Sequence, residues 1–270
     1  MKILITGHQG FIGKNLSAYL KKDFEIFGYE WDASTFPSVS NYDWVIHLGA
    51  ISSTTEKDVD KIMRQNYEFS KKLFNECNKH HVNLQYASSA SVYGNSTDFN
   101  EDATKHPGSP YSWSKYLFDR WVFQQPRNIT VQGFRYFNVY GPNEEHKGNQ
   151  ASPYTKFSKQ AKETGTVTLF KGSEDFKRDF ICVDDICEVH KLMLNINQSN
   201  IWNLGSGTAT SFETVGQLIA QKYNATLNYI DMPDDLKKQY QSYTCADMSA
   251  LNNIINKKFI DIKDYINGSN

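Results

Sequence analysis

The sequence predicts an α/β protein built on a doubly wound parallel sheet. Short apolar segments rich in β-branched residues alternate with longer segments of helical period through the first half of the chain. Three glycines spaced three apart, Gly7, Gly10 and Gly13, lie where the first apolar segment meets the first helical one. With 270 residues against about 150 for an average domain, the chain also has room for a smaller α/β lobe.

The first predicted elements are a strand, a glycine turn and a helix. Residues Lys2–Thr6 form a leucine- and isoleucine-rich strand, and a helix is predicted over 14–22, after the glycine turn. A second strand is predicted over 24–30. Only the segment 33–41 separates it from the next strand, which is too short for the usual third strand with its own crossover helix.

The later elements continue this alternation and then become less regular. Strands are predicted over 42–50, 84–89, 129–136 and 167–170, and helices over 59–79 and 110–124. Beyond Gly141 a polar stretch covers 142–150, and a second glycine turn follows at 204–207. The smaller lobe is therefore expected in this later part of the chain.

Composition and charge exclude several classes of protein. A content of 39% hydrophobic and 22% charged residues is typical of globular proteins rather than disordered or fibrous ones. Lysine and arginine total 29 against 30 acidic residues, so we expect no nucleic-acid partner. No apolar run reaches the roughly 18 residues of a membrane span, and the start of the chain lacks the pattern of a signal peptide. We expect no membrane partner and a cytoplasmic location.

The cysteines and histidines do not have the spacing of a metal site. The four cysteines form no CxxC pair, and the adjacent His80 and His81 are poorly arranged to share one ion from a helix face. We therefore predict free, buried thiols and no metal.

The glycine turn predicts a dinucleotide site, because it lets the backbone approach a pyrophosphate and directs a helix N-terminus at it. The residues expected to hold the cofactor here are Gly7, Gly10, Phe11, Ile12 and Gly13. The second strand ends in Glu30 and Asp32, either of which would accept hydrogen bonds from the adenosine ribose. No lysine or arginine lies between Asp23 and Val45, which favours NAD over NADP.

A tyrosine and a lysine four residues apart are candidates for proton transfer. Tyr111 and Lys115 project from one face of the predicted helix 110–124. A tyrosine, with an ordinary pKa of about 10, becomes a base near neutrality if an ammonium and a nicotinamide cation stabilise its phenolate. Lys115 can also hold the nicotinamide ribose. Ser89 ends its strand where it can bind the substrate oxygen, and Ser88 is the competing candidate.

Five motifs together resemble the extended short-chain dehydrogenase/reductases, specifically the NAD-dependent epimerase/dehydratase family that modifies nucleotide sugars. They are Thr6–Gly13, His47–Ala50, Ser88–Gly94, Tyr111–Lys115 and Arg178–Asp185. The resemblance implies a Rossmann-type domain, expected over 1–141 and 177–204, and a substrate lobe over 142–176 and 205–270. We also assign cofactor contacts to Leu48, Gly49, Ala50 and Asn66, beside Tyr111 and Lys115.

Within this family the chain most resembles the ADP-L-glycero-D-manno-heptose 6-epimerases. The motifs concerned are Ser52–Glu56, Phe134–Pro142, His146–Gly148, Phe170–Phe180 and Gln239–Asp247. Such enzymes oxidise C6 of the heptose with a bound nicotinamide and return the hydride to the other face of the ketone. The resemblance implies a nucleotide-diphosphate sugar as substrate and leaves NADP open beside NAD.

The resemblance also supplies a second acid/base group and the substrate contacts. Lys147 is the candidate for the acid/base group on the other side of the carbonyl, the alternative being a solvated loop lysine. Arg178 is expected to bind the diphosphate, or else to pair with Asp179 or Asp184. Asn138 is expected to position the substrate, or else only to end its strand.

The remaining expected sugar contacts are serines, a threonine and a tyrosine. Ser52, Ser53 and Thr54 either touch the sugar or cap the helix that follows, with equal weight. Tyr243 belongs to the late motif that resembles the heptose epimerases, and it is assigned to substrate binding on that ground.

Other functions are compatible with parts of the pattern. A dehydratase is disfavoured, because Ser89 is followed by Ala90 and Ser91 instead of the Asp-Glu pair of the related sugar 4,6-dehydratases. Another nucleotide-sugar epimerase, such as a 4-epimerase, or a reductase is the first alternative. A noncatalytic dinucleotide-binding protein is the second, and the intact tyrosine, lysine and serine argue against it. By resemblance we expect a homo-oligomer.

Overall fold

The computed structural model describes residues 1–53, 56–237 and 241–268, which form two compact units. Unit 1 comprises 1–96, 101–136 and 186–203, and unit 2 comprises 97–100, 137–185 and the described part of 204–270. Residues 97–100, 137–141, 177–185 and 204, expected in the dinucleotide domain, thus belong to unit 2. For 137–141 and 177–185 the reason is that β6 (Asn138–Tyr140) pairs with β8 (Lys177–Cys182) in a separate sheet.

Unit 1 is built on a six-stranded sheet in the order β2-β1-β3-β4-β5-β9. The strands are β1 (Lys2–Thr6), β2 (Glu25–Tyr29), β3 (Trp44–His47), β4 (Asn83–Ser89), β5 (Val131–Tyr136) and β9 (Asn200–Leu204). The first five pair in parallel, as the sequence predicts. Residues 30–43 hold no helix or strand, so the expected loss of one crossover unit is confirmed.

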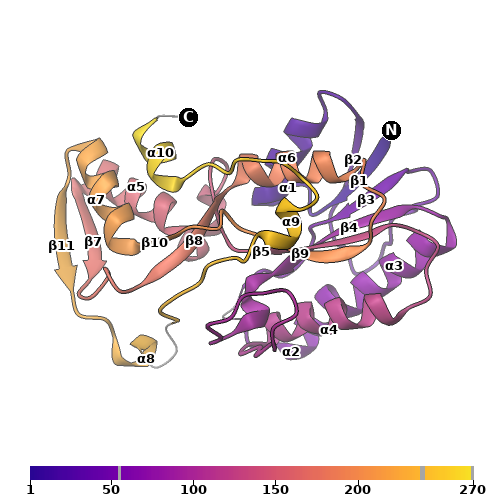
Figure 1. Ribbon diagram of the computed structural model, residues 1–270, viewed down its shortest axis with the longest axis horizontal. Helices are drawn as coiled ribbons and strands as arrows, with labels where there is room; N and C mark the ends of the chain where they lie inside the picture. The colour runs from indigo at the N-terminus through magenta and orange to yellow at the C-terminus, as the bar shows by residue number, and fades with distance from the viewer. Residues whose placement is uncertain (54–55, 238–240, 269–270) are drawn as a thin grey trace. The chain divides into compact units, whose positions relative to one another are not determined.

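Helices cover both faces of this sheet (Figure 1), which confirms the doubly wound fold. They are α1 (Phe11–Leu20), α2 (Val59–Ile62), the π-helical turn η1 (Met63–Glu68), α3 (Phe69–Lys79), the 3-10 turn η2 (Ala90–Tyr93), α4 (Pro110–Gln124) and α6 (Val183–Met193). Side chains of α3 and α4 pack on one face, and side chains of α1 and the end of α6 pack on the other.

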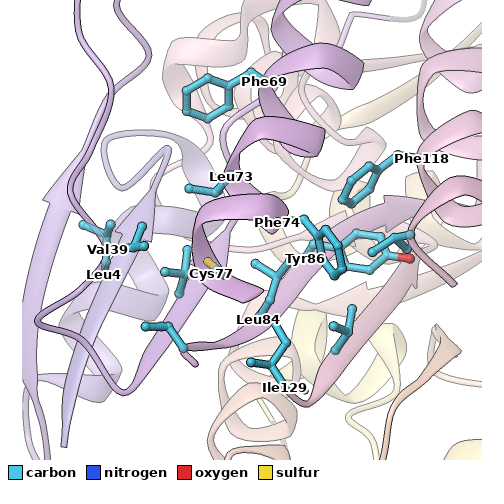
Figure 2. Packing of buried hydrophobic residues seen from close by; sticks show 14 residues of the cluster. Leu4, Val39, Phe69, Leu73, Phe74, Cys77, Leu84, Tyr86, Phe118 and Ile129 are labelled. Atoms are coloured by element: carbon cyan, nitrogen blue, oxygen red, sulfur yellow. The ribbon is translucent and has the colours of Figure 1, made fainter. Parts of the chain in front are cut away.

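The two faces of the sheet follow from the alternation of side chains along each strand. In β1, Ile3 and Ile5 pack with Leu16 of α1, whereas Leu4 packs with Leu73 of α3. Figure 2 shows the α3 side of this core, where α3 and Phe118 of α4 lie over the sheet. Both faces are apolar, which is why the strands of a parallel sheet read as continuous hydrophobic segments.

Two element boundaries differ from the sequence prediction at the glycine turn. The helix expected from residue 14 begins at Phe11, with Gly10 as its N-cap. The strand expected over 42–50 ends at His47, because the next two residues turn back onto β1. There the Leu48 N–H donates to the Thr6 carbonyl, at 3.1 Å, and the Gly49 N–H donates to the Thr6 hydroxyl, at 3.3 Å.

Unit 2 carries more regular structure than the weak sequence pattern beyond Gly141 predicts. Its strands form a three-stranded sheet, β10-β8-β6, and a parallel pair, β11-β7. Besides β6 and β8, the elements are η3 (Glu145–Gln150), α5 (Pro153–Thr164), β7 (Thr166–Phe170), β10 (Ala209–Ser211), α7 (Phe212–Tyr223), β11 (Thr226–Ile230), α8 (Asp234–Lys237), α9 (Ser249–Asn252) and α10 (Ile262–Asn267). α5, α7 and α10 bury their apolar side chains in one core.

All four cysteines are free thiols. Cys77, Cys182 and Cys187 are buried, and Cys245 is half-buried. None of the helices in the described ranges has the length and apolar character that crossing a bilayer requires.

Two buried histidines join polar side chains inside unit 1. The His190 ring lies 2.6 Å from the Tyr136 hydroxyl through Nε2 and 2.6 Å from the Gln85 amide oxygen through Nδ1. The His47 ring lies 2.6 Å from the Thr6 hydroxyl and 2.7 Å from the Ser70 hydroxyl. Burial lowers the pKa of each histidine to about 3, so both rings are neutral in the folded protein.

The buried histidines predict a loss of stability in mild acid. In the unfolded chain His190 titrates near pH 6.5, whereas the folded chain binds that proton only near pH 3. Below about pH 6.5 the unfolded state therefore takes up more protons, and the free energy of unfolding falls by about 1.4 kcal/mol per pH unit for each such histidine. Denaturant titrations at several pH values should give a shallower slope for His190→Gln than for the wild type. The exposed His81→Asn should keep the wild-type slope, and equal slopes for all three proteins would contradict the prediction.

Candidate active site

The glycine turn of unit 1 forms a backbone cradle at the start of α1. Gly7 has a φ of +73°, and a Cβ there would lie 2.6 Å from the Cα of Gly49. A Cβ on Gly13 would lie 2.1 Å from the Gly7 carbonyl oxygen. Gly10, as N-cap, carries no side chain that would fold over the start of the helix. These residues fit a bound pyrophosphate, because the backbone is bare where a phosphate approaches a helix N-terminus.

Of the two acids predicted to bind the adenosine ribose, Glu30 lies at the glycine turn. Its carboxylate accepts the Gln9 N–H at 2.7 Å and lies 3.1 Å from Nδ1 of His8. Asp32 instead accepts the N–H and the hydroxyl of Ser34, both at 2.7 Å. Of the two acids, Glu30 is thus the one that contacts the glycine turn.

Asn66, predicted to contact the cofactor, uses both of its side-chain groups within the protein. Its amide oxygen accepts the Ile51 N–H at 2.8 Å, and its NH2 group donates to the Ile51 carbonyl at 3.0 Å and to the Ser114 hydroxyl at 3.2 Å. The π-helical turn η1 carries Asn66. Asn66 therefore holds the loop that follows β3, where Leu48, Gly49 and Ala50 lie, against α4.

The tyrosine, lysine and serine of the predicted triad come together in unit 1. Ser89 ends β4, and its side chain lies close enough to Tyr111, in the first turn of α4, to lower the pKa of the phenol. The Lys115 ammonium, one turn further, lies 6.0 Å from the centre of the Tyr111 ring and donates to the Ala87 carbonyl at 2.9 Å. The competing Ser88 faces the other side of the strand, where its hydroxyl donates to Asp119 at 2.9 Å.

Burial changes the pKa of both Tyr111 and Lys115. Burial is the largest effect on Tyr111 and raises its pKa. The charge of Asp119 raises this pKa further, whereas the Ser89 side chain lowers it. Burial lowers the pKa of Lys115 to about 8, against the opposing effect of Asp119. The buried phenolate of Tyr111 therefore needs positive charge beyond that of Lys115, as expected from the sequence, where a nicotinamide cation is the second charge.

Lys147 lies in η3 of unit 2, close to a buried carboxylate. Its ammonium is 3.9 Å from Oε1 of Glu144. Glu144 is 1% exposed and accepts the Ser152 N–H at 2.6 Å, the Ser152 hydroxyl at 2.7 Å and the Thr155 hydroxyl at 2.6 Å. Burial lowers the pKa of Lys147, and the charge of Glu144 opposes this. Lys147 is thus half-buried and held near an acid, unlike a freely solvated loop lysine.

Arg178 in β8 does not pair with Asp179, one of the two acids considered for it. Its guanidinium donates to the carbonyls of Lys177 and Gln241 and lies over the Phe212 ring. The Asp179 carboxylate instead accepts the N–H groups of Ser206, at 2.6 Å, and Ala246, at 2.9 Å.

The other predicted substrate residues fall on three different segments. Asn138 begins β6 and pairs with Phe180 of β8, so it does more than end β5. Tyr243 is 42% exposed and forms an isolated β-bridge with Lys177. Ser52 is exposed and Ser53 half-buried, whereas Thr54 lies outside the described residues. The N-cap of α2 is Asp58, which accepts the Lys61 N–H at 2.9 Å, so the capping alternative for Ser52 and Ser53 was wrong.

Three acids near these segments are buried, which the sequence analysis did not predict. Asp119, Glu144 and Asp179 are each at most 2% exposed, and each accepts at least three hydrogen bonds. The one sequence signal was that Asp119 continues the four-residue spacing of Tyr111 and Lys115 along α4.

The motifs, the fold and the glycine cradle define a dinucleotide-dependent enzyme of the nucleotide-sugar class. Residues 30–205 match the NAD dependent epimerase/dehydratase family, and the chain belongs to this family. This confirms the resemblance drawn from the motifs, the expected NAD dependence and the assignment to an enzyme family.

Curated and solved relatives point to particular members of the family. The chain is 37% identical to an ADP-L-glycero-D-manno-heptose-6-epimerase of Brachyspira hyodysenteriae, over 92% of this chain and 90% of that protein. It shares its fold with the crystal structure of the Helicobacter pylori ADP-L-glycero-D-manno-heptose-6-epimerase (TM-score 0.87, 24% identity, 99% and 94% of the two chains). It also shares its fold with the Thermus thermophilus UDP-glucose 4-epimerase in complex with NAD (TM-score 0.83, 22% identity, 98% and 96% of the chains).

The cradle predicts the effect of one added methyl group. Gly13→Ala would drive Cβ into the Gly7 carbonyl oxygen, so the turn must open and NAD affinity should fall by about tenfold or more. Calorimetric titration with NAD would measure it. Gly108→Ala is the matched control, because a Cβ there meets nothing within 4 Å. Unchanged affinity of Gly13→Ala would contradict this account of the turn.

Proposed function

We propose that this chain is a nucleotide-sugar epimerase that inverts C6 of an ADP-glycero-manno-heptose through transient oxidation to a ketone, with a tightly bound NAD. The observation that carries the reaction type is that Tyr111, Lys115 and Ser89 lie together in unit 1, with the Lys115 ammonium 6.0 Å from the centre of the Tyr111 ring and Ser89 close enough to lower the pKa of Tyr111. The heptose is supported by the 37% identity with the Brachyspira hyodysenteriae enzyme over 92% of this chain.

The cofactor is held by the glycine turn and its neighbours. Gly7, Gly10, Phe11, Ile12 and Gly13 surround the pyrophosphate, and Glu30 accepts hydrogen bonds from the adenosine ribose. Leu48, Gly49 and Ala50 line the same side of the turn, and Lys115 holds the nicotinamide ribose. NAD held there would supply the acceptor for the C6 hydride and the source of its return to the opposite face. NADP is disfavoured, since no basic side chain follows β2 before Val45.

Tyr111 moves the proton on one side of the reacting carbon. As a phenolate it takes the proton of the C6 hydroxyl while Ser89 holds the same oxygen by a hydrogen bond. Burial raises the pKa of Tyr111, so the phenolate needs positive charge nearby to be stable. The protein supplies part of this charge through the Lys115 ammonium.

Lys147 acts as the acid/base group on the other side of the carbonyl. A lysine suits this role when burial lowers its pKa, because it then exchanges a proton closer to neutral pH. The contact with Glu144 holds the ammonium in one place. Asn138, Tyr243, Ser52 and Ser53 contact the sugar.

Arg178 binds the diphosphate by charge-assisted hydrogen bonds. Support comes from the resemblance of the segment 170–180, which contains Arg178, to the heptose epimerases. We further propose that the enzyme is a cytoplasmic homo-oligomer. Trp113 on α4 is 46% exposed, and large exposed aromatic side chains are enriched at protein interfaces.

The reaction itself is the first test. Proton NMR of the purified protein with ADP-D-glycero-D-manno-heptose, without added cofactor, should follow conversion to the L-glycero epimer. Tyr111→Phe should lose about 100-fold or more of the turnover and still bind NAD, because only the proton transfer is removed. If the wild type converts none of the substrate even with NAD and NADP supplied, the heptose is wrong, and a panel of other nucleotide sugars tests for a 4-epimerase or reductase. Full activity of Tyr111→Phe in the cell would instead favour a noncatalytic dinucleotide-binding protein.

The second acid/base group predicts a separate loss. Lys147→Met keeps the length of the side chain and removes the proton, so turnover should fall by about 100-fold or more while NAD affinity stays at the wild-type value. Lys159→Met on the exposed side of α5 is the matched control and should keep full turnover. Substantial turnover by Lys147→Met would remove Lys147 from the mechanism.

A further inference from the structure

The helix that carries Tyr111 and Lys115 also carries a buried carboxylate that no step of the proposed reaction uses. Tyr111, Lys115 and Asp119 are spaced four apart, so they form one stripe along α4. Asp119 is 2% exposed. An ionised carboxylate at such a site is tolerated only when it is paired and hydrogen-bonded, so its partners define what it does.

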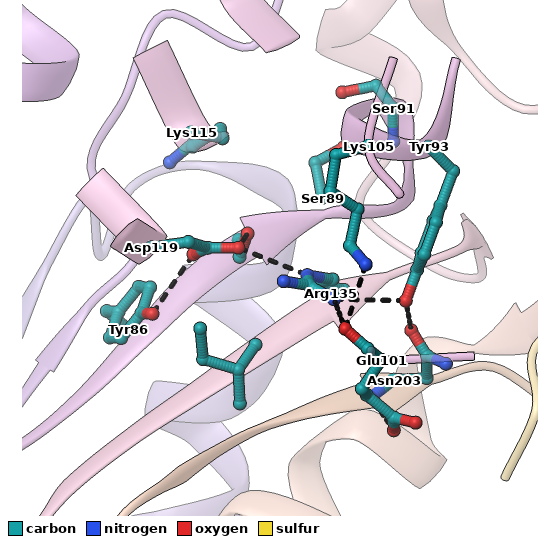
Figure 3. A network of polar contacts seen from close by, with 12 residues as sticks. Tyr86, Ser89, Ser91, Tyr93, Glu101, Lys105, Lys115, Asp119, Arg135 and Asn203 are labelled. Atoms are coloured by element: carbon teal, nitrogen blue, oxygen red, sulfur yellow. Dashed lines mark hydrogen bonds and ion pairs between the residues drawn. The ribbon is translucent and has the colours of Figure 1, made fainter. Parts of the chain in front are cut away.

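Three donors from two neighbouring strands converge on Asp119, and Figure 3 shows two of them, Tyr86 and Arg135. The Tyr86 hydroxyl donates to Oδ1 at 3.0 Å, and the Ser88 hydroxyl donates to Oδ2 at 2.9 Å. The Arg135 guanidinium on β5 donates to Oδ2 at 3.1 Å and forms a buried ion pair with it. Asp119 therefore ties α4 to β4 and β5 immediately before Ser89.

The sheet leaves space for this arrangement. Gly133 on β5 pairs with Tyr86 on β4, and a Cβ on Gly133 would lie 2.5 Å from the hydroxyl oxygen and Cζ of Tyr86. A glycine at this position lets the tyrosine ring lie across β5 with its hydroxyl at Asp119.

Arg135 extends the connection beyond Asp119. Its NH1 group donates to the Tyr93 hydroxyl at 3.1 Å and to the Glu101 carbonyl at 3.1 Å. The Lys105 ammonium donates to the same Glu101 carbonyl at 2.8 Å. The Asp119–Arg135 ion pair thus also fixes the turn η2 and the segment 101–105. Both follow Ser89 in the chain.

Among the titratable groups around Lys115, Asp119 is the anionic partner. His47 is neutral because burial lowers its pKa to about 3, and the buried Tyr111 is neutral unless it has given up its proton. The cations Arg135 and Lys105 lie beyond Asp119 in the same network. The Asp119 charge raises the pKa of both Lys115 and Tyr111.

We propose that Asp119 is a positioning residue that keeps Lys115 protonated and Ser89 in place beside Tyr111, and so sets the pH range in which the proton transfer operates. The proposal rests on the proposed function, in which Tyr111 and Lys115 carry that transfer. Asp119 acts only through these residues and touches neither substrate nor cofactor.

The test is the pH profile of Asp119→Asn, which keeps the shape of the side chain and removes its charge. Loss of the charge lowers the pKa of Tyr111 and of Lys115, so the rising and the falling limb of kcat should both move to lower pH. At about pH 8, turnover should fall on the order of tenfold. Asp185→Asn, which breaks a buried ion pair with Lys257 in unit 2, is the matched control and should leave both limbs in place.

A second readout separates this proposal from the proposed function. The ultraviolet absorbance of the Tyr111 phenolate, taken as the difference between each protein and its Tyr111→Phe counterpart with NAD bound, titrates Tyr111 without any substrate. We expect this titration to move to lower pH in Asp119→Asn. The proposal would be overturned if both limbs of the kcat profile and the Tyr111 titration of Asp119→Asn stayed at their wild-type pH values while the rate fell equally at every pH. Asp119 would then be a structural residue. If the wild type epimerises no heptose, the proposed function fails, while the titration still decides the role of Asp119.

Discussion

The burial of both faces of a parallel sheet is the constraint on which the rest of the structure depends. Strands that pair in parallel need crossover connections, and those connections place α1 and the end of α6 over one face and α3 and α4 over the other. All carboxyl ends of the strands then lie on one edge of the sheet. The glycine turn follows β1, the Asn66-held loop follows β3 and Ser89 ends β4, so the chemistry gathers on this edge.

The same constraint explains how polar groups survive inside unit 1. Side chains that face a helix-covered sheet lose water, and each polar atom there needs a partner. His190 is matched by Tyr136 and Gln85, and Asp119 by Tyr86, Ser88 and Arg135. The interior is therefore specified by directional contacts as well as by apolar packing, and one of these contacts lies on the helix that holds the proton-transfer residues.

The elements that could be predicted from the sequence are those whose signal is local. Strand β1 and helix α4 have the predicted bounds, because a β-branched run and a Ser109 cap followed by proline are readable within a few residues. Tyr111 and Lys115 were found for the same reason, since their spacing is that of one helical turn. Ser88 and Ser89 could not be separated from the sequence, because the choice depends on which face of β4 meets α4.

The residues that were missed depend on contacts between distant segments. Asp119 meets Arg135 across 16 positions, and Asp179 meets Ala246 across 67. Nothing in the neighbouring residues marks such an acid as buried. The strands β6 and β10 of unit 2 are hard to predict for a different reason, because three residues are too few for an alternating pattern to be readable.

The π-helical turn η1 has a consequence for how this chain tolerates changes in length. A π turn holds one residue more than an α-helical turn of the same path, so η1 is equivalent to a one-residue insertion absorbed within a helix. Ile62 before the turn and Leu73 after it are both buried, and Asn66 within the turn binds the loop after β3. Removing the extra residue would leave an α-helical turn on the same path, so α3 would keep its orientation relative to α2. The irregular turn therefore adds a loop-binding residue to the helical segment without disturbing the packing on either side of it.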